Sequence, residues 1–229
     1  MERELAKQIL EETKNDFNRI APDFSRTRSR FWPELVTVFQ GFAKDGNKIL
    51  DIGCGNGRLL DLYAGKGVDY TGIDNSFAQI EEAKKRCPNN SFLVADALKL
   101  PFADKSFDKT FSVAVLHEIP SLEFRKAFLK EARRVLKDEG LLFLTAWDLR
   151  GRIGLILKYS FLKIIKRSGL DWGDIFIPWG SEVQRYYHVF GKREISRLVK
   201  SSGFEIIKTG VARKQDRSMA NLYLIAKKQ

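Results

Sequence analysis

From residue 47 onward, short apolar runs alternate with segments in which apolar side chains recur every three to four positions. The short runs predict seven strands, at 48–52, 69–73, 91–95, 109–116, 141–146, 205–211 and 221–227. The periodic segments predict helices at 57–63, 76–86, 122–136 and 192–201. Alternation of this kind is typical of an α/β fold, with a mostly parallel sheet covered by helices on both faces.

Two segments lie outside the alternation. Residues 1–45 predict an N-terminal helical cap, with a helix over 2–20, a turn at A-P-D-F-S and a second helix from Pro33. Residues 151–190 predict an insertion or substrate loop after the fifth strand, which opens with a basic amphipathic stretch at 151–167. We expect residues 1–229 to form a single domain with these two additions.

A glycine-rich turn follows the first strand. The segment 48–57 is K-I-L-D-I-G-C-G-N-G, with Asp51 near the strand end, and the second strand is followed by Asp74. Glycines permit close approach of a ligand to the backbone, and an acid after the second strand can bind the hydroxyls of a ribose. The pattern predicts a nucleoside-cofactor site.

The glycine spacing narrows the choice of cofactor. In a dinucleotide fingerprint that starts at Gly53 and Gly55, the third glycine would stand at position 58, where this chain has Arg58. The spacing is D-x-G-x-G-x-G, which resembles motif I of the class I S-adenosylmethionine-dependent methyltransferases. This resemblance implies a Rossmann-like fold and S-adenosylmethionine as cofactor.

Further segments resemble the same family over residues 47–147. Asp96 in V-A-D-A matches the family's acid near the adenine, and the end of the fourth strand, 113–117, matches its reaction centre. Because ligands bind beyond the carboxyl ends of parallel strands, we expect Asp51, Asp74, Asp96 and His117 to converge. The cofactor-binding residues that the resemblance implies are Asp51, Gly53, Cys54, Gly55, Gly57, Asp74, Asn75, Asp96, Ala97 and Val113.

Segments on both sides of this core resemble a narrower group, the transfer-RNA methyltransferases that esterify the carboxymethyl group of a wobble uridine. These segments are I-A-P-D-F-S-R-T-R-S-R-F-W-P, I-P-W, R-Y-Y-H and M-A-N-L-Y-L. The group includes the methyltransferase part of the AlkB-type fusion enzyme. The catalytic residues that this resemblance implies are Arg28, His117, Trp179, Arg185, Tyr186 and Asn221.

The chain departs from that group at two places. The group usually has two consecutive histidines after the fourth strand, whereas His117 is followed by Glu118. The aromatic pair after Asn221 is replaced by Leu222 and Tyr223. Both differences bear on the identity of the substrate.

A carboxylate acceptor would need no general base, because with a pKa of about 4 it is ionised at neutral pH. It would need a clamp, and arginine binds carboxylates through two parallel hydrogen bonds. We therefore expect Arg28 and Arg185 to hold the acceptor, while His117, Trp179, Tyr186 and His188 shape a uracil pocket.

The charge balance bears on the partner. The chain has 40 Lys and Arg against 29 Asp and Glu, a net charge of +11, with basic clusters at 26–30, 158–167 and 213–217. This excess favours a polyanion, and tRNA is the expected partner, although surplus lysine can also serve solubility alone. The resemblance also implies a small zinc-binding activator on the sheet edge formed by the third strand.

The cysteines and the hydropathy of the chain argue against a metal site and a membrane span. The two cysteines, Cys54 and Cys87, have no metal-ligand spacing, so we expect no metal site. No apolar run approaches the ~20 residues of a membrane span and no secretory signal is present, so the expectation is a cytoplasmic protein without stable membrane insertion.

Two other functions fit the same residues. The first is methylation of a small molecule or lipid intermediate, with 151–167 reaching a membrane; the second is a non-catalytic cofactor-binding protein that docks on RNA or on an activator. The stretch 151–167 is equally compatible with a lid packed on the core.

Overall fold

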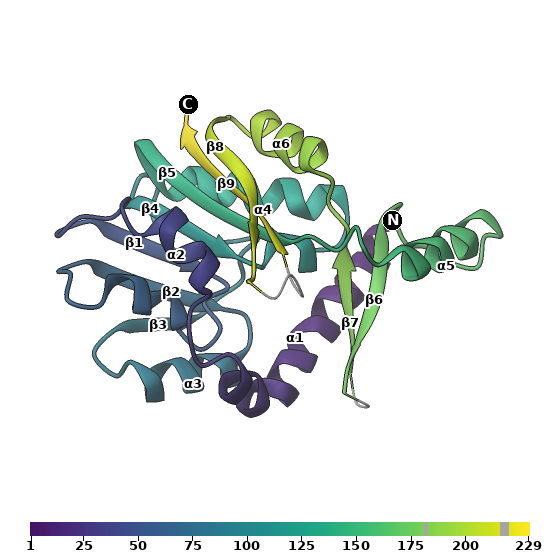
Figure 1. Ribbon diagram of the computed structural model, residues 1–229, viewed down its shortest axis with the longest axis horizontal. Helices are drawn as coiled ribbons and strands as arrows, with labels where there is room; N and C mark the ends of the chain where they lie inside the picture. The colour runs from purple at the N-terminus through teal and green to yellow at the C-terminus, as the bar shows by residue number, and fades with distance from the viewer. Residues whose placement is uncertain (181–182, 216–219) are drawn as a thin grey trace.

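The computed structural model (Figure 1) describes residues 1–180, 183–215 and 220–229. Arg217 of the third basic cluster and Met219 of the M-A-N-L-Y-L segment lie outside the described residues. Within the described part, no helix is long and apolar enough to cross a membrane.

A seven-stranded sheet forms the centre of the molecule, and it confirms the predicted fold class. Its strand order is β3-β2-β1-β4-β5-β9-β8, in which β9 alone runs in the direction opposite to the other six strands. The strands are β1 Lys48–Ile52, β2 Asp69–Asp74, β3 Ser91–Val94, β4 Phe107–Val113, β5 Leu136–Trp147, β8 Phe204–Arg213 and β9 Ala220–Lys228. The crossover between β3 and β4 reverses the direction in which strands are added, and ligands of such sheets bind at this switch point.

Helices cover both faces of the sheet (Figure 1). One face packs against α4, Leu122–Val135, and α6, Lys192–Ser201, whose side chains join a large buried cluster. The other packs against α2, Pro33–Phe39, the 3-10 helix η1, Arg58–Tyr63, and α3, Phe77–Arg86. The apolar side of each amphipathic helix therefore packs against an apolar face of the sheet.

The end of β4 differs from the predicted strand 109–116. The strand stops at Val113, Ala114 adopts a positive φ of 62°, and a short 3-10 helix, η2 at Leu116–Glu118, follows. The apolar run continues because Leu116 is buried, so the hydrophobic pattern could not mark the end of the strand. His117 therefore lies beyond the strand, on η2.

The predicted turn at A-P-D-F-S is wrong, because helix α1 continues over Arg3–Thr27 with Pro22 inside it. Proline removes one helical hydrogen bond, which usually ends a helix. Here Ile20 and Ala21 are buried, and Phe24 packs edge-on against Phe17 at 5.7 Å and contacts Trp179 at 6.1 Å between ring centroids. These contacts hold the helix together across the proline.

The predicted substrate loop contains a helix and a β-hairpin. Helix α5, Ile153–Ile164, projects from the side of the molecule (Figure 1), and β6, Asp174–Trp179, pairs antiparallel with β7, Val183–His188. The I-P-W segment ends β6 and R-Y-Y-H ends β7. One side of α5 is exposed and apolar, at Ile153, Leu157, Phe161 and Ile164.

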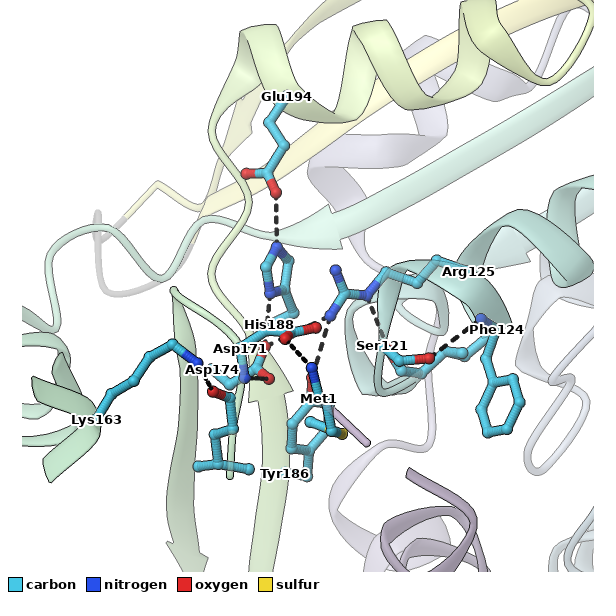
Figure 2. Close-up of polar contacts among 12 residues, drawn as sticks. Met1, Ser121, Phe124, Arg125, Lys163, Asp171, Asp174, Tyr186, His188 and Glu194 are labelled. Atoms are coloured by element: carbon cyan, nitrogen blue, oxygen red, sulfur yellow. Dashed lines mark hydrogen bonds and ion pairs between the residues drawn. The ribbon is translucent and has the colours of Figure 1, made fainter. Parts of the chain in front are cut away.

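A buried polar network fixes the hairpin to the main body (Figure 2). The His188 ring nitrogens lie 2.7 Å from the Asp174 carboxylate and 2.8 Å from that of Glu194 on α6. Arg125 on α4 donates to Asp174 at 3.4 Å and to the Tyr186 hydroxyl at 3.2 Å. Burial opposes protonation of His188, but the hydrogen bonds with the two carboxylates outweigh it and raise its pKa.

Replacement of His188 by Gln should lower the free energy of unfolding by about 1–3 kcal/mol, because two carboxylates lose a charged partner. The folded-state pKa of His188 is raised above the unfolded value. Its stabilising contribution is therefore complete below about pH 6.5 and is lost as the pH rises through the folded-state pKa.

The measurement is chemical denaturation of both proteins from pH 5 to 9, with Gln184→Ala on the exposed side of β7 as the control. A stability difference that grows with pH would contradict this role of His188.

Candidate functional site

A cavity opens at the carboxyl ends of β1, β2, β4 and β5. Each of these strands contributes its last residues to the lining, and α1 covers the cavity from the other side through Leu10, Thr13, Phe17 and Phe24. Of the predicted cofactor-binding residues, those that line it are Asp51, Gly53, Cys54, Gly55, Asp74, Asn75, Asp96, Ala97 and Val113. The structure thus brings together nine residues from four separate segments of the sequence.

The glycine turn after β1 needs glycine for its backbone angles and for its close contacts. Gly53, Gly55 and Gly57 have φ values of 75°, 53° and 75°, which side-chain-bearing residues rarely adopt. A Cβ on Gly53 would lie 2.4 Å from Val115 Cγ2. Gly57 does not line the cavity; a Cβ there would press on the Phe92 ring at 3.0 Å. Gly57 shapes the turn from behind.

The acids at this end of the cavity differ in environment. Asp51 is buried, which raises its pKa to about 7, and it accepts a hydrogen bond from the Tyr70 hydroxyl at 2.8 Å. The Asp74 carboxylate accepts the backbone N–H of Gly55 at 3.0 Å, and burial raises its pKa. Asp96 lies at the rim. This half of the cavity therefore offers oxygen acceptors and negative charge.

Three arginines, Arg28, Arg58 and Arg185, line the cavity. Arg28 and Arg185 surround Trp179, which lines the adjoining groove and not the cavity itself. The guanidinium carbons of Arg28 and Arg185 lie 5.1 Å and 5.3 Å from the centroid of the Trp179 ring. Arg28 follows the last residue of α1, whereas Arg185 comes from β7. Burial and the charge of Arg185 lower the pKa of Arg28, which nevertheless stays cationic at neutral pH. Arg28 and Arg185 can therefore bind an anion.

His117 does not line the cavity with the acids, contrary to expectation. It is fully buried, with its ring 5.3 Å from Tyr187 and 5.5 Å from Trp147. Burial, together with the charge of Arg185, lowers its pKa to about 3, so the imidazole is neutral. Because η2 turns away from the strand, His117 packs against the rings of Trp147 and Tyr187 and does not line the cavity.

Tyr186 and Asn221 also lie outside the cavity. Successive side chains of a strand point to opposite faces, so Tyr186 packs with Ile9 and Leu170 while Tyr187 faces Arg185. Asn221 is buried on β9 opposite Trp147, and its amide has no hydrogen-bond partner among the described residues.

The sequence reasoning missed several residues of this site. Glu118 pairs with Arg185, and Trp147 and Phe17 enclose it. Period-two alternation along R-Y-Y-H could have selected Tyr187 over Tyr186, because it places Arg185 and Tyr187 on one face.

The acidic half suits a ligand that carries hydroxyls and positive charge. At Gly55 the turn leaves space that a Cβ would fill, and the side-chain amide of Gln79, which lines the cavity, is buried without a hydrogen-bond partner among the described residues. Across residues 1–180, 183–215 and 220–229, there is no group of three metal-ligating side chains. These features fit an organic cationic cofactor.

Comparison with known proteins agrees with this geometry. A family model described as a methyltransferase domain matches residues 50–144. An Encephalitozoon cuniculi protein named as a putative methyltransferase is 32% identical over 191 residues, which are 82% of this chain and 84% of that protein. The Saccharomyces cerevisiae tRNA (carboxymethyluridine(34)-5-O)-methyltransferase is 33% identical over 170 residues, 71% of this chain and 54% of that protein.

Solved structures show the same fold. A SAM-dependent methyltransferase from Methanosarcina mazei has a TM-score of 0.72 at 26% identity, covering 87% of this chain and 98% of its own. A Haloferax volcanii protein in complex with the Trm112 methyltransferase activator has a TM-score of 0.68 at 16% identity, covering 94% and 96%.

Substitution of Gly53 by Ala tests the glycine turn. The added Cβ meets Val115 and forces a strained φ, whereas a Cβ added to Gly65, which has a φ of 78°, would meet nothing within 4 Å. Gly65→Ala therefore adds backbone strain alone and is the matched control.

We expect Gly53→Ala to lower the free energy of unfolding by about 1–3 kcal/mol more than Gly65→Ala, because overpacking adds to strain. Urea denaturation measures both. Equal losses would show that Val115 moves aside freely.

Proposed function

Because the chain belongs to the class I S-adenosylmethionine-dependent methyltransferases, we propose that it methylates the carboxylate of a carboxymethyl group on a modified wobble uridine of tRNA. The observation that carries this proposal is the pair of arginines beside Trp179, Arg28 and Arg185, which line the same cavity as the acids. Two cations at the acceptor end suit an anionic nucleophile.

The acidic half would hold the cofactor. When bound, S-adenosylmethionine supplies an electrophilic methyl group on a positively charged sulfur. Asp74 and Asp96 would bind the nucleoside, and Asp51 with the glycine turn would lie beside the methionine part. The negative charge of Asp51 becomes less costly beside a cation, because an opposite charge offsets the desolvation that raises its pKa.

The arginines would hold and aim the acceptor. In the transfer, an ionised carboxylate oxygen forms a bond to the methyl carbon, and the electron pair of the broken carbon–sulfur bond stays on sulfur. No proton has to be removed, so no general base is needed. The neutral, enclosed His117 is consistent with a transfer that needs no base, because its ring packs against Tyr187.

The RNA substrate is supported by charge and by the relatives. The net charge of +11 favours a polyanion, and the yeast relative bears the name of a carboxymethyluridine-34 methyltransferase. The chain spans about half the length of that relative. Arg152, at the start of α5, lines a second groove with Arg28 and Trp179, which would extend the binding surface for RNA.

A small activator subunit would bind at β3. This strand lies at the edge of the sheet, and Leu93 and Val94 on it are exposed together with Phe77 at the start of α3. An edge strand beside exposed apolar side chains can accept an added strand. The Haloferax volcanii protein of the same fold was solved with an activator, which supports this part of the proposal. Co-purification of such a subunit would test it.

A second candidate is methylation of a lipid-borne acceptor. The exposed apolar side of α5 favours it, because Lys158 and Lys163 flank Ile153, Leu157 and Phe161 at helical spacing. In this case α5 would rest on a membrane surface while the same cavity performs the transfer.

One assay separates the candidates. The protein is incubated with cofactor labelled in the methyl group and with bulk tRNA from cells that lack this ester, in the presence and absence of anionic vesicles. Base-labile label in tRNA supports the proposed function, and label in the organic extract supports the lipid candidate. Cofactor binding without transfer to either would indicate a non-catalytic docking protein and contradict both.

Replacement of Arg28 by Lys should lower kcat/KM for the tRNA by about tenfold or more, because lysine loses the planar fork that binds a carboxylate through two hydrogen bonds. Arg26→Lys is the matched control, since Arg26 is exposed and paired with Asp23. Steady-state kinetics and cofactor titration measure both variants. Equal activity of the two variants would contradict the role of Arg28 in binding the acceptor.

A further inference from the structure

Arg185 is nearly buried, and part of its hydrogen-bonding capacity is unused. Its side chain is 5% exposed, and its Nη2 donates to the Glu118 carboxylate. Its Nε and Nη1 are buried without a hydrogen-bond partner among the described residues. Since buried unpaired donors are costly, an acceptor group that enters the cavity would stabilise them.

Four aromatic rings hold this guanidinium in place. The distances from its central carbon to the ring centroids are 4.6 Å for Phe17, 5.1 Å for Tyr187, 5.3 Å for Trp179 and 5.7 Å for Trp147. The rings attract the cation and keep water from it. The free donors are therefore fixed in position before any acceptor binds.

Glu118 is the anion that balances this cation. It lies on η2 and lines the same cavity as Arg28 and Arg185. Burial raises the pKa of Glu118 to about 7 even though Arg185 opposes the shift. Its charged form therefore depends on Arg185.

We propose that Glu118 is a positioning residue that shares Arg185 with the acceptor and so selects a single carboxylate. This inference rests on the proposed function. Three arginines, Arg28, Arg58 and Arg185, line the cavity with Glu118. Glu118 occupies Nη2 of Arg185, which leaves the remaining donors of Arg185 for one carboxylate. A second negative charge on the acceptor beside Glu118 would be repelled.

The sharing of Arg185 between Glu118 and the acceptor also keeps the acceptor carboxylate reactive. An arginine that bonds both carboxylate oxygens withdraws electron density from the nucleophile. With Nη2 engaged by Glu118, Nε and Nη1 point in different directions, so the acceptor would take one of these donors through one oxygen and its other oxygen would stay free to react. Glu118 thus weakens acceptor binding and raises the rate of transfer.

The test is Glu118→Gln, which keeps size and removes charge. We expect KM for the tRNA acceptor to fall about threefold to tenfold, since repulsion is lost, and kcat to fall about tenfold, since Arg185 then grips the acceptor more tightly. Glu123→Gln is the matched control, because Glu123 is exposed on α4 and does not line the cavity; it should change neither constant.

A merely structural role would lower the fraction of active enzyme, and hence kcat, without lowering KM. Unchanged kinetics, or loss of kcat with KM unchanged or raised, would overturn the inference. If Glu118→Gln does not fold, Glu118→Ala removes the same charge, and the same fall in both constants is expected of it.

The product separates this inference from the proposed function. A base-labile methyl ester made by the wild-type protein supports the proposed function, and only the two kinetic constants of the variant report on Glu118. Absence of the ester would overturn both, whereas an ester together with wild-type kinetics in Glu118→Gln would overturn the role of Glu118 alone.

Discussion

The burial of one positive charge, the guanidinium of Arg185, is the constraint on which the site depends. A buried cation is tolerated only where its surroundings offset the lost hydration. In this protein the surroundings come from the N-terminal helix, the central sheet, the hairpin and η2. The contributing residues are Phe17, Trp147, Trp179, Tyr187 and Glu118. The segments added to the common sheet thus meet around a single charge.

The cavity is lined by charges of both signs. Asp51 and Asp74 lie beyond β1 and β2, and Arg28 and Arg185 lie near Trp179. A cationic methyl donor and an anionic acceptor would each be attracted to the side chains of opposite charge. The same layout disfavours two ligands of equal charge. Selectivity for a pair of reactants therefore follows from the arrangement of charges as well as from shape.

Much of the fold and of the cofactor half could be predicted from the sequence. Hydrophobic periods of two and 3.6 reveal the elements, and the unusual backbone angles at Gly53 and Gly55 restrict those positions to glycine. Contacts between distant segments could not be read in this way. Tertiary packing carries α1 past Pro22, and the strand register buries Tyr186 in the core instead of the cavity. The partner of Glu118 likewise appears only in three dimensions.

Helix α1 forms one wall of the cavity along much of its length, from Leu10 to Phe24, and Arg28 and Trp32 beyond it continue that wall. Every ligand that contacts this wall adds to the free energy needed to detach the N-terminal segment. Occupancy of the cavity and local unfolding of the first 32 residues are thus thermodynamically linked. The start of the chain would exchange its amide hydrogens more slowly as the site fills.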